Sequence, residues 1–384
     1  MAERKAKALS LLKSAWKWSW LVTLPVAVFF LVWAANTTRQ YIQFKLKFNS
    51  TTPVSAAGLG GTEAKALVND MKGFFIPRWR TKAGLEGIHL FVKESELARL
   101  NSDLPYSGRE YVEARLRYPD GKMGEVKMKY RGDFLYHWIG RKKSIRIKTK
   151  KGGLYDGVRE FNLIIPKTKY VNMDHVSYQA ARRMGVLSPE ARMVEVYING
   201  EYSGVYLYVE QLSEGFLRRN GRMPGDLFVG EMVGRDKVPG VTQEVFSNPA
   251  FWTKAAVSNY NSPEWAAPLE ELTGSVYRND FGAMNRLLDM EAFGRFAAFV
   301  TLTRTAHFDL THNWRLFFDP SRGVFEPVVW DPMGWWFRDF VKWVDKQSNS
   351  MDIITSIFFE RLHRDHGFLE AKQAAMEAFF RDGG

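Results

Sequence analysis

An uncharged apolar stretch near the start of the chain limits where this protein can reside. Between Lys17 and Arg39 the sequence carries no charged residue for 21 positions, from Trp18 to Thr38. As a helix rising 1.5 Å per residue, such a stretch is about 30 Å long, which is the thickness of a hydrocarbon core. We therefore predict a retained transmembrane signal anchor over residues 18–38. A cleaved signal peptide is the competing interpretation.

The charges around this span predict its orientation. Five Lys or Arg residues precede it within residues 1–17, which predicts a cytoplasmic basic tail. The bulk of the protein would then face the periplasm or extracellular space from a bacterial inner membrane. The whole chain has 54 Lys and Arg against 42 Asp and Glu, a net charge of +12. This excess suits nucleic acid, anionic lipid or a phosphate-bearing ligand, and among these we expect no nucleic-acid partner.

Composition limits the remaining fold and chemistry. The absence of cysteine excludes disulfide frameworks, thiolate zinc sites, iron–sulfur clusters and cysteine nucleophiles. With 46% apolar residues, the 384-residue chain can bury a large core. Residues 39–80 are rich in small and polar residues and are predicted to form a linker with one short helix. The folded domain is then expected over residues 81–384.

Alternating apolar residues predict antiparallel strands in the first part of this domain. Hairpins are expected at Asp120-Gly121 and Asn199-Gly200, and a helix that ends at Gly185 is expected before the second of them. In the strand near 143–150, Arg146 and Lys148 share one face and isoleucines occupy the other. One side of this strand is therefore core and the other is cationic.

A second hairpin region carries the polar residues that suggest chemistry. A helix is expected over residues 290–307, followed by two strands whose pairing brings Asn313 and Asp331 to one mouth, with Asp309 nearby. Two hard oxygen ligands in such a position suit Mg²⁺. The alternative for Asp331 is a turn cap. His307 and His312 have the spacing of metal ligands, but we expect them to be structural rather than zinc-binding.

Phosphoryl transfer needs the residue types that this pattern supplies. One carboxylate orients the acceptor, an amide and a second carboxylate hold the metal, and a strand lysine binds the phosphates. Lys143 or Lys148 could provide the last group, although a solvated surface role for Lys148 is the alternative. In the order of elements found in protein kinases, the strand 204–212 would lead to the hinge, with Glu210 and Gln211 beside the adenine.

These segments resemble the CotH kinase family from about Ile88 to Trp336. The matching text is VEARLRYPDGKMGEVKMKYRGD, RKKSIRIK, HVSYQAARRMGV, VYINGEYSGVYLYVEQL and HNWRLFFDPSRGVFEPVVWD. The resemblance implies an α+β, kinase-like two-lobed fold behind the transmembrane helix. It has a mixed or antiparallel sheet N-lobe (81–212), a mainly helical C-lobe (213–384), and dependence on ATP and Mg²⁺ or Mn²⁺. It assigns roles to six positions: Asp309 as catalytic aspartate, Asp331 as metal ligand, Asn313 as accessory ligand, and Lys143, Lys148 and Arg131 on the phosphate side.

The sequence departs from the family pattern at two informative places. Met333 stands where the family usually has a second metal carboxylate, and the helix over 175–184 has no Glu to pair with a strand lysine. The leading prediction is a membrane-anchored CotH-like kinase that phosphorylates Ser or Thr of an envelope or secreted protein. The alternatives are a pseudokinase scaffold and a phosphoryl transferase for a surface polymer, the latter suggested by the aromatic residues after Asp331. The sequence predicts no oligomeric state.

Overall fold

The computed structural model describes most of the chain, in two compact units that divide after residue 78, with 104–106 belonging to the first. The residues described are 19–47, 55–75, 84–102, 104, 110–132, 137–166, 171–232, 243–256, 266–335 and 352–384.

The first unit holds two helices, α2 (Trp20–Lys47) and α3 (Ala56–Phe75). Within α2, Trp20–Gln43 is long and apolar enough to cross a membrane, with a mean hydropathy of 1.7. A signal sequence would meet the same criteria, so the anchor prediction is supported by length and composition only. Residues 39–80 were expected to form a linker with one short helix. In the structure α2 continues to Lys47, and α3 is 20 residues long. Leu59 of α3 is fully buried, so α3 is held by packing as well as by propensity.

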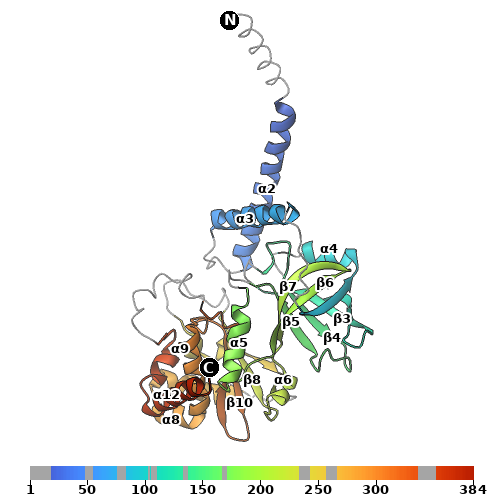
Figure 1. The fold of residues 1–384 in the computed structure, drawn as a ribbon. Coiled ribbons are helices and arrows are strands. Elements are labelled where there is room, and N and C mark those ends of the chain that lie inside the picture. Colours follow the sequence, from blue (N-terminus) through green and yellow to red (C-terminus); the bar gives the residue numbers. More distant parts are fainter. Residues whose placement is uncertain are drawn as a thin grey trace, which may run out of the picture. The chain divides into compact units, whose positions relative to one another are not determined.

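The second unit begins with a closed barrel in the order β1-β2-β3-β4-β5-β7-β6 (Figure 1). Its elements are β1 (Glu86–Val92), α4 (Glu94–Ser102), β2 (Val112–Arg117), β3 (Met123–Tyr130), β4 (Ile145–Thr149), β5 (Glu160–Ile164), α5 (Met173–Arg183), β6 (Ala191–Ile198) and β7 (Glu201–Glu210). The α+β class is confirmed, and so are the two hairpins and the helix. The kinase-like two-lobed fold is not confirmed, because parallel pairing of β1 with β6 closes the predicted mixed or antiparallel sheet into a seven-stranded barrel.

Most barrel strands bury one face, whereas the second half of β7 is buried on both faces. In β2 and β3 alternate residues are buried inside the barrel, as a sheet with one solvated face requires. In β7, Tyr206 and Tyr208 point into the barrel, where Tyr208 stacks on Phe161 with ring centroids 4.9 Å apart. The neighbouring residues Leu207 and Val209 belong to a second hydrophobic core. β7 therefore forms a wall shared by the two cores.

The rest of the second unit combines helices with a four-stranded antiparallel sheet in the order β11-β10-β8-β9. Its elements are α6 (Glu214–Arg219), β8 (Asp226–Gly230), β9 (Trp252–Ala256), α7 (Ala267–Arg278), α8 (Phe281–Leu287), α9 (Met290–Thr303), β10 (Trp314–Asp319), β11 (Val324–Pro327), α11 (Ile357–Leu362) and α12 (His366–Arg381). The predicted helix at 290 and the β10–β11 hairpin are confirmed. The expected mainly helical C-lobe omits this sheet, whose β8 and β9 carry weak sequence signals.

Two contacts hold this part together and can be tested. Gly294 of α9 lies so close to α12 that a Cβ there would be 2.6 Å from the Cβ of Ala371. The carboxylate of Glu326 on β11 is buried and accepts hydrogen bonds from Arg222 at 2.6–3.1 Å. The barrel and the C-terminal elements are joined by α5, which lies between them (Figure 1), and by the hydrogen bond from Val329 N–H to Leu187 O at 2.8 Å.

Candidate functional site

Asp309 lies in the loop between α9 and β10 and is held there by its own neighbours. Its Oδ1 accepts hydrogen bonds from Thr311 N–H at 2.7 Å, the Thr311 hydroxyl at 3.0 Å, His312 N–H at 3.0 Å and His312 Nδ1 at 2.8 Å. Burial opposes ionisation, but the hydrogen bonds from His312 and Thr311 outweigh it and lower the pKa of Asp309. Its side chain remains 33% exposed. Among the described residues no hydrogen bond reaches Oδ2, which leaves this oxygen for a ligand.

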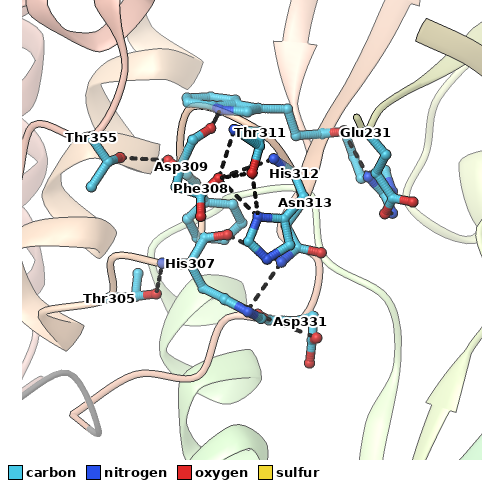
Figure 2. Close-up of polar contacts among 12 residues, drawn as sticks. Glu231, Thr305, His307, Phe308, Asp309, Thr311, His312, Asn313, Asp331 and Thr355 are labelled. Atoms are coloured by element: carbon cyan, nitrogen blue, oxygen red, sulfur yellow. Dashed lines mark hydrogen bonds and ion pairs between the residues drawn. The ribbon is translucent and has the colours of Figure 1, made fainter. Parts of the chain in front are cut away.

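His307 connects the other two predicted residues (Figure 2). Its Nδ1 lies 2.5 Å from the carbonyl oxygen of Asp331 and 3.8 Å from the Asp331 carboxylate. A carbonyl only accepts, so Nδ1 of His307 carries the hydrogen. The amide nitrogen of Asn313 donates instead to the His307 carbonyl at 3.1 Å, which turns its Oδ1 away from His307. The structure thus gathers Asn313 and Asp331 around His307, and the rings of His307 and His312 are 5.0 Å apart.

Asp331 is also tied to helix α5. Its backbone N–H donates to the hydroxyl of Tyr178 at 3.0 Å, and Tyr178 is fully buried. Burial raises the pKa of Tyr178, the charges of Asp331 and Asp174 raise it further, and the charge of Arg131 lowers it. Arg131 therefore acts on the same hydroxyl as Asp331. The charge of Arg131, one of the predicted phosphate-side residues, is thus felt at the tyrosine that contacts Asp331.

Backbone strain concentrates in this region. Eight non-glycine residues have positive φ in the described part of the chain, and five of them lie between 304 and 335: Arg304, Asn313, Asp331, Met333 and Trp335. Left-handed conformations at such residues are sparsely populated and persist where the surrounding structure enforces them. Functional sites are where they tend to cluster. Asn313, at φ +67°, and Asp331, at φ +49°, are both among them.

The strand lysines have local partners. Lys148 on β4 forms an ion pair with Glu160 on β5 at 3.3 Å, and its side chain is 39% exposed. Arg146, on the same face, donates to Asn162 at 2.9 Å. The cationic face of β4 predicted from the alternation is therefore present. The ammonium of Lys143 donates to the carbonyl of Gly140. The described contacts link neither lysine to Asp331.

Glu210 lies on the opposite face of the sheet from Arg146 and Lys148. It shares the parity of Tyr206 and Tyr208, which point into the barrel, and its buried carboxylate is paired with Arg219. Gln211 instead accepts from Asn162 at 3.0 Å, on the cationic face. Glu210 and Lys148, both expected to contact the same nucleotide, therefore lie on opposite faces of the sheet. Gln211 is the member of the Glu210-Gln211 pair that faces the same side as Lys148.

His307 is predicted from the sequence only as a structural histidine, and Tyr178 is not predicted from it at all. Nothing in the spacing of Tyr178 distinguishes it from other core aromatics, because its role depends on a contact with a residue 153 positions away. Among the residues that the structure describes, no group of three or more His, Asp or Glu side chains could hold a metal ion. A divalent cation here would need the carboxylate of Asp331, the amide oxygen of Asn313 and ligand phosphates, which is a donor set that Mg²⁺ accepts.

Comparison with known proteins places the chain in a family. Residues 128–379 match the family model described as CotH kinase protein, so the chain belongs to the CotH kinase protein family. The matched region contains both the end of the barrel strand β3 and the whole candidate site. The chain is also similar to inner spore coat protein H of Bacillus subtilis (strain 168), with 22% identity over 265 residues that cover 68% of this chain and 71% of that protein. The predicted family is therefore confirmed.

Proposed function

We propose that this protein is a membrane-anchored kinase that transfers the γ-phosphate of ATP to Ser or Thr of an envelope or secreted protein. The observation that carries the proposal is the convergence of Asn313 and Asp331 on His307, next to Asp309, in a member of the CotH kinase protein family. These are an amide and two carboxylates, the side chains that phosphoryl transfer uses to hold a metal nucleotide and to orient an acceptor hydroxyl.

Each residue has a role that follows from its contacts. Asp309 has a lowered pKa and one oxygen already engaged, so its Oδ2 would accept and orient the acceptor hydroxyl rather than act as a strong base. Asp331 and the Oδ1 of Asn313 would hold Mg²⁺ or Mn²⁺. Arg131 would bind phosphate oxygens from the barrel side. Bound Mg²⁺-ATP would supply the phosphoryl group and neutralise its developing charge.

The cationic face of β4 suits the remainder of the nucleotide. Among the described ion pairs, Arg146 and Lys148 share one acidic partner, Glu160, at 3.8 and 3.3 Å respectively. Two positive charges against one negative charge leave a net positive surface that attracts phosphates. We assign Lys148 and Lys143 to this electrostatic role. Because the carboxylate of Glu210 is buried against Arg219, contact with the adenine falls to Gln211.

The test is metal-dependent labelling by the full-length protein in detergent with γ-labelled ATP. We expect Asp331→Asn and Asp309→Asn to abolish transfer. Asp319→Asn is the matched control, because Asp319 lies at the other end of the same hairpin and accepts from Ser321 N–H and hydroxyl much as Asp309 does from Thr311. Labelling that persists in the two site variants would refute the assignment. Label found in a glycan instead of protein would favour a surface-polymer transferase. Of the aromatic residues in 331–344 that suggest this alternative, those after Trp335 lie outside the described residues.

A pseudokinase scaffold is the second candidate, favoured by one observation. Met333 occupies the position of the second metal carboxylate and has a left-handed backbone, φ +42°. A site with one carboxylate binds a divalent cation more weakly than a site with two. If the full-length protein shows neither metal-dependent transfer nor a metal-dependent thermal shift with ATP, the scaffold replaces the kinase as the better proposal.

A further inference from the structure

Helix α3 has an apolar face that the first unit leaves exposed. Leu67 is 42% exposed, Val68 47% and Met71 56%. At 3.6 residues per turn, positions i, i+1 and i+4 fall on one side of a helix. An exposed apolar stripe of this kind is characteristic of helices that lie in a membrane interface. Thr62, which is partly exposed, lies on the opposite side of α3, about 170° around the helix from the middle of this stripe.

A different side of α3 contacts α2. Leu59 is fully buried, a Cβ at Gly60 would lie 3.6 Å from the Cγ2 of Thr37, and the Thr37 hydroxyl donates to Glu63. These positions repeat the i, i+1, i+4 pattern eight residues before the exposed stripe. Eight residues at about 100° each bring the exposed stripe about 80° around the helix from the α2-facing side. A helix lying flat on a bilayer beside a spanning helix needs this quarter-turn between its two contact faces.

The point where α3 contacts α2 lies near the end of the membrane-spanning part of α2. Thr37 is 17 residues after Trp20, or about 26 Å along α2 at 1.5 Å per residue. This is close to the roughly 30 Å thickness of a hydrocarbon core. The first charged residue after the apolar span, Arg39, follows two positions later. α3 therefore crosses α2 at the boundary between its apolar and polar parts, and Figure 1 shows α3 lying across α2.

From these three observations we infer that α3 is an interfacial helix that buries Leu67, Val68 and Met71 in the headgroup–acyl boundary of the bilayer. This inference rests on the proposed membrane anchor and adds a second contact with the lipid. α2 alone would leave the chain free to rotate about one axis, whereas a helix lying on the bilayer fixes the direction in which the chain leaves the membrane at residue 75.

Because the chain contains no cysteine, single cysteines can carry a spin label without background. We would place Leu67→Cys and Met71→Cys on the proposed lipid face, Thr62→Cys on the opposite face, and Phe29→Cys within α2. The labelled full-length protein would be inserted in vesicles of phosphatidylethanolamine and phosphatidylglycerol. Collisions with oxygen, which partitions into lipid, and with a water-soluble nickel chelate would then be measured at each position.

We expect the oxygen-to-nickel ratio at 67 and 71 to exceed the ratio at 62 severalfold, with the highest ratio at 29. A low ratio at 67 and 71 together with a high ratio at 29 would overturn the inference for α3 and leave the anchor intact. A low ratio at 29 would overturn the anchor itself. Labels at 67 and 71 shielded from both reagents, with spin–spin broadening, would mean that a second copy of the chain covers this face, and this too would overturn the lipid contact.

Discussion

Replacing Tyr178 with Phe tests whether helix α5 positions the candidate metal ligand. The substitution keeps the buried ring and removes only the hydroxyl that accepts from Asp331 N–H at 3.0 Å. Leaving a buried backbone N–H without its acceptor costs about 1–3 kcal/mol. The cost falls on a residue whose φ of +49° already requires external support. We therefore expect lower stability and a displaced Asp331.

The matched control is Tyr208→Phe. Tyr208 is also fully buried, but it points into the barrel, and its hydroxyl makes no hydrogen bond among the described residues. Removing a buried hydroxyl that lacks a partner should be neutral or stabilising. Any difference between the two variants therefore measures the contact with Asp331 and not the loss of a tyrosine hydroxyl from a core.

The assays are denaturant unfolding and initial rates of phosphoryl transfer at varied Mg²⁺-ATP concentration. If about 1 kcal/mol of positioning is lost in the transition state, kcat falls about fivefold in Tyr178→Phe, with no change in Tyr208→Phe. A loss of stability with unchanged kcat and KM would mean that Tyr178 only supports the fold. Equal stability and equal kinetics in the two variants would refute the reasoning altogether.

Three further predictions concern stability. Burial lowers the pKa of His363, and the nearby Lys372 adds to this, while the Phe359 carbonyl and Asp352 oppose it. The folded state therefore favours the neutral ring, so the free energy of unfolding is highest above the ordinary pKa near 6.5 and falls as the pH drops below it. His363→Phe should reduce the change in the unfolding midpoint between pH 7.5 and 5.5. Gly294→Leu should lose about 1–3 kcal/mol or more by forcing α9 from α12, whereas Gly282→Ala, with only ordinary contacts, should not destabilise. Arg222→Met should cost about 1–3 kcal/mol, because the buried Glu326 carboxylate loses the hydrogen bonds from Arg222 and keeps the one from Arg322 at 3.3 Å. Its exposed counterpart Arg218→Met should cost under about 1 kcal/mol; equal costs by denaturant titration would contradict the burial argument.

Local signals allowed much of the fold to be predicted. Asn199 and Gly200 both have positive φ, as the type I′ turn requires, and that chemistry is visible in the dipeptide itself. The helix α5 ends at a glycine in the left-handed region, Gly185 with φ +69°, which its sequence also indicates. Barrel closure could not be predicted in this way, because the parallel pairing of β1 with β6 joins segments about a hundred residues apart and has no turn to mark it.

In the candidate site too, contacts between residues near in sequence could be predicted, and contacts between distant segments could not. Asn313 and Asp331 could be placed together because a single hairpin connects them. The face of Glu210 could not be predicted, because β7 is buried on both sides and its sequence therefore lacks the alternation of polar and apolar residues that reveals orientation. Tyr178 reaches Asp331 from an element far away in the sequence, so only the folded structure shows their link.

The contacts of residues 332–335 bear on the proposal that a single carboxylate holds the metal. Trp335 N–H donates to the Thr303 carbonyl at 2.6 Å, and the Thr305 hydroxyl donates to the Pro332 carbonyl. A Cβ at Gly334 would lie 2.5 Å from the Ser177 hydroxyl and 3.0 Å from the Thr303 Cβ, so the loop packs tightly between α5 and α9. Mg²⁺ keeps several waters and needs only one or two protein carboxylates when phosphates are present. If Asp331 is the metal ligand that we propose, these contacts would hold it in place with Met333 at the position of the second carboxylate.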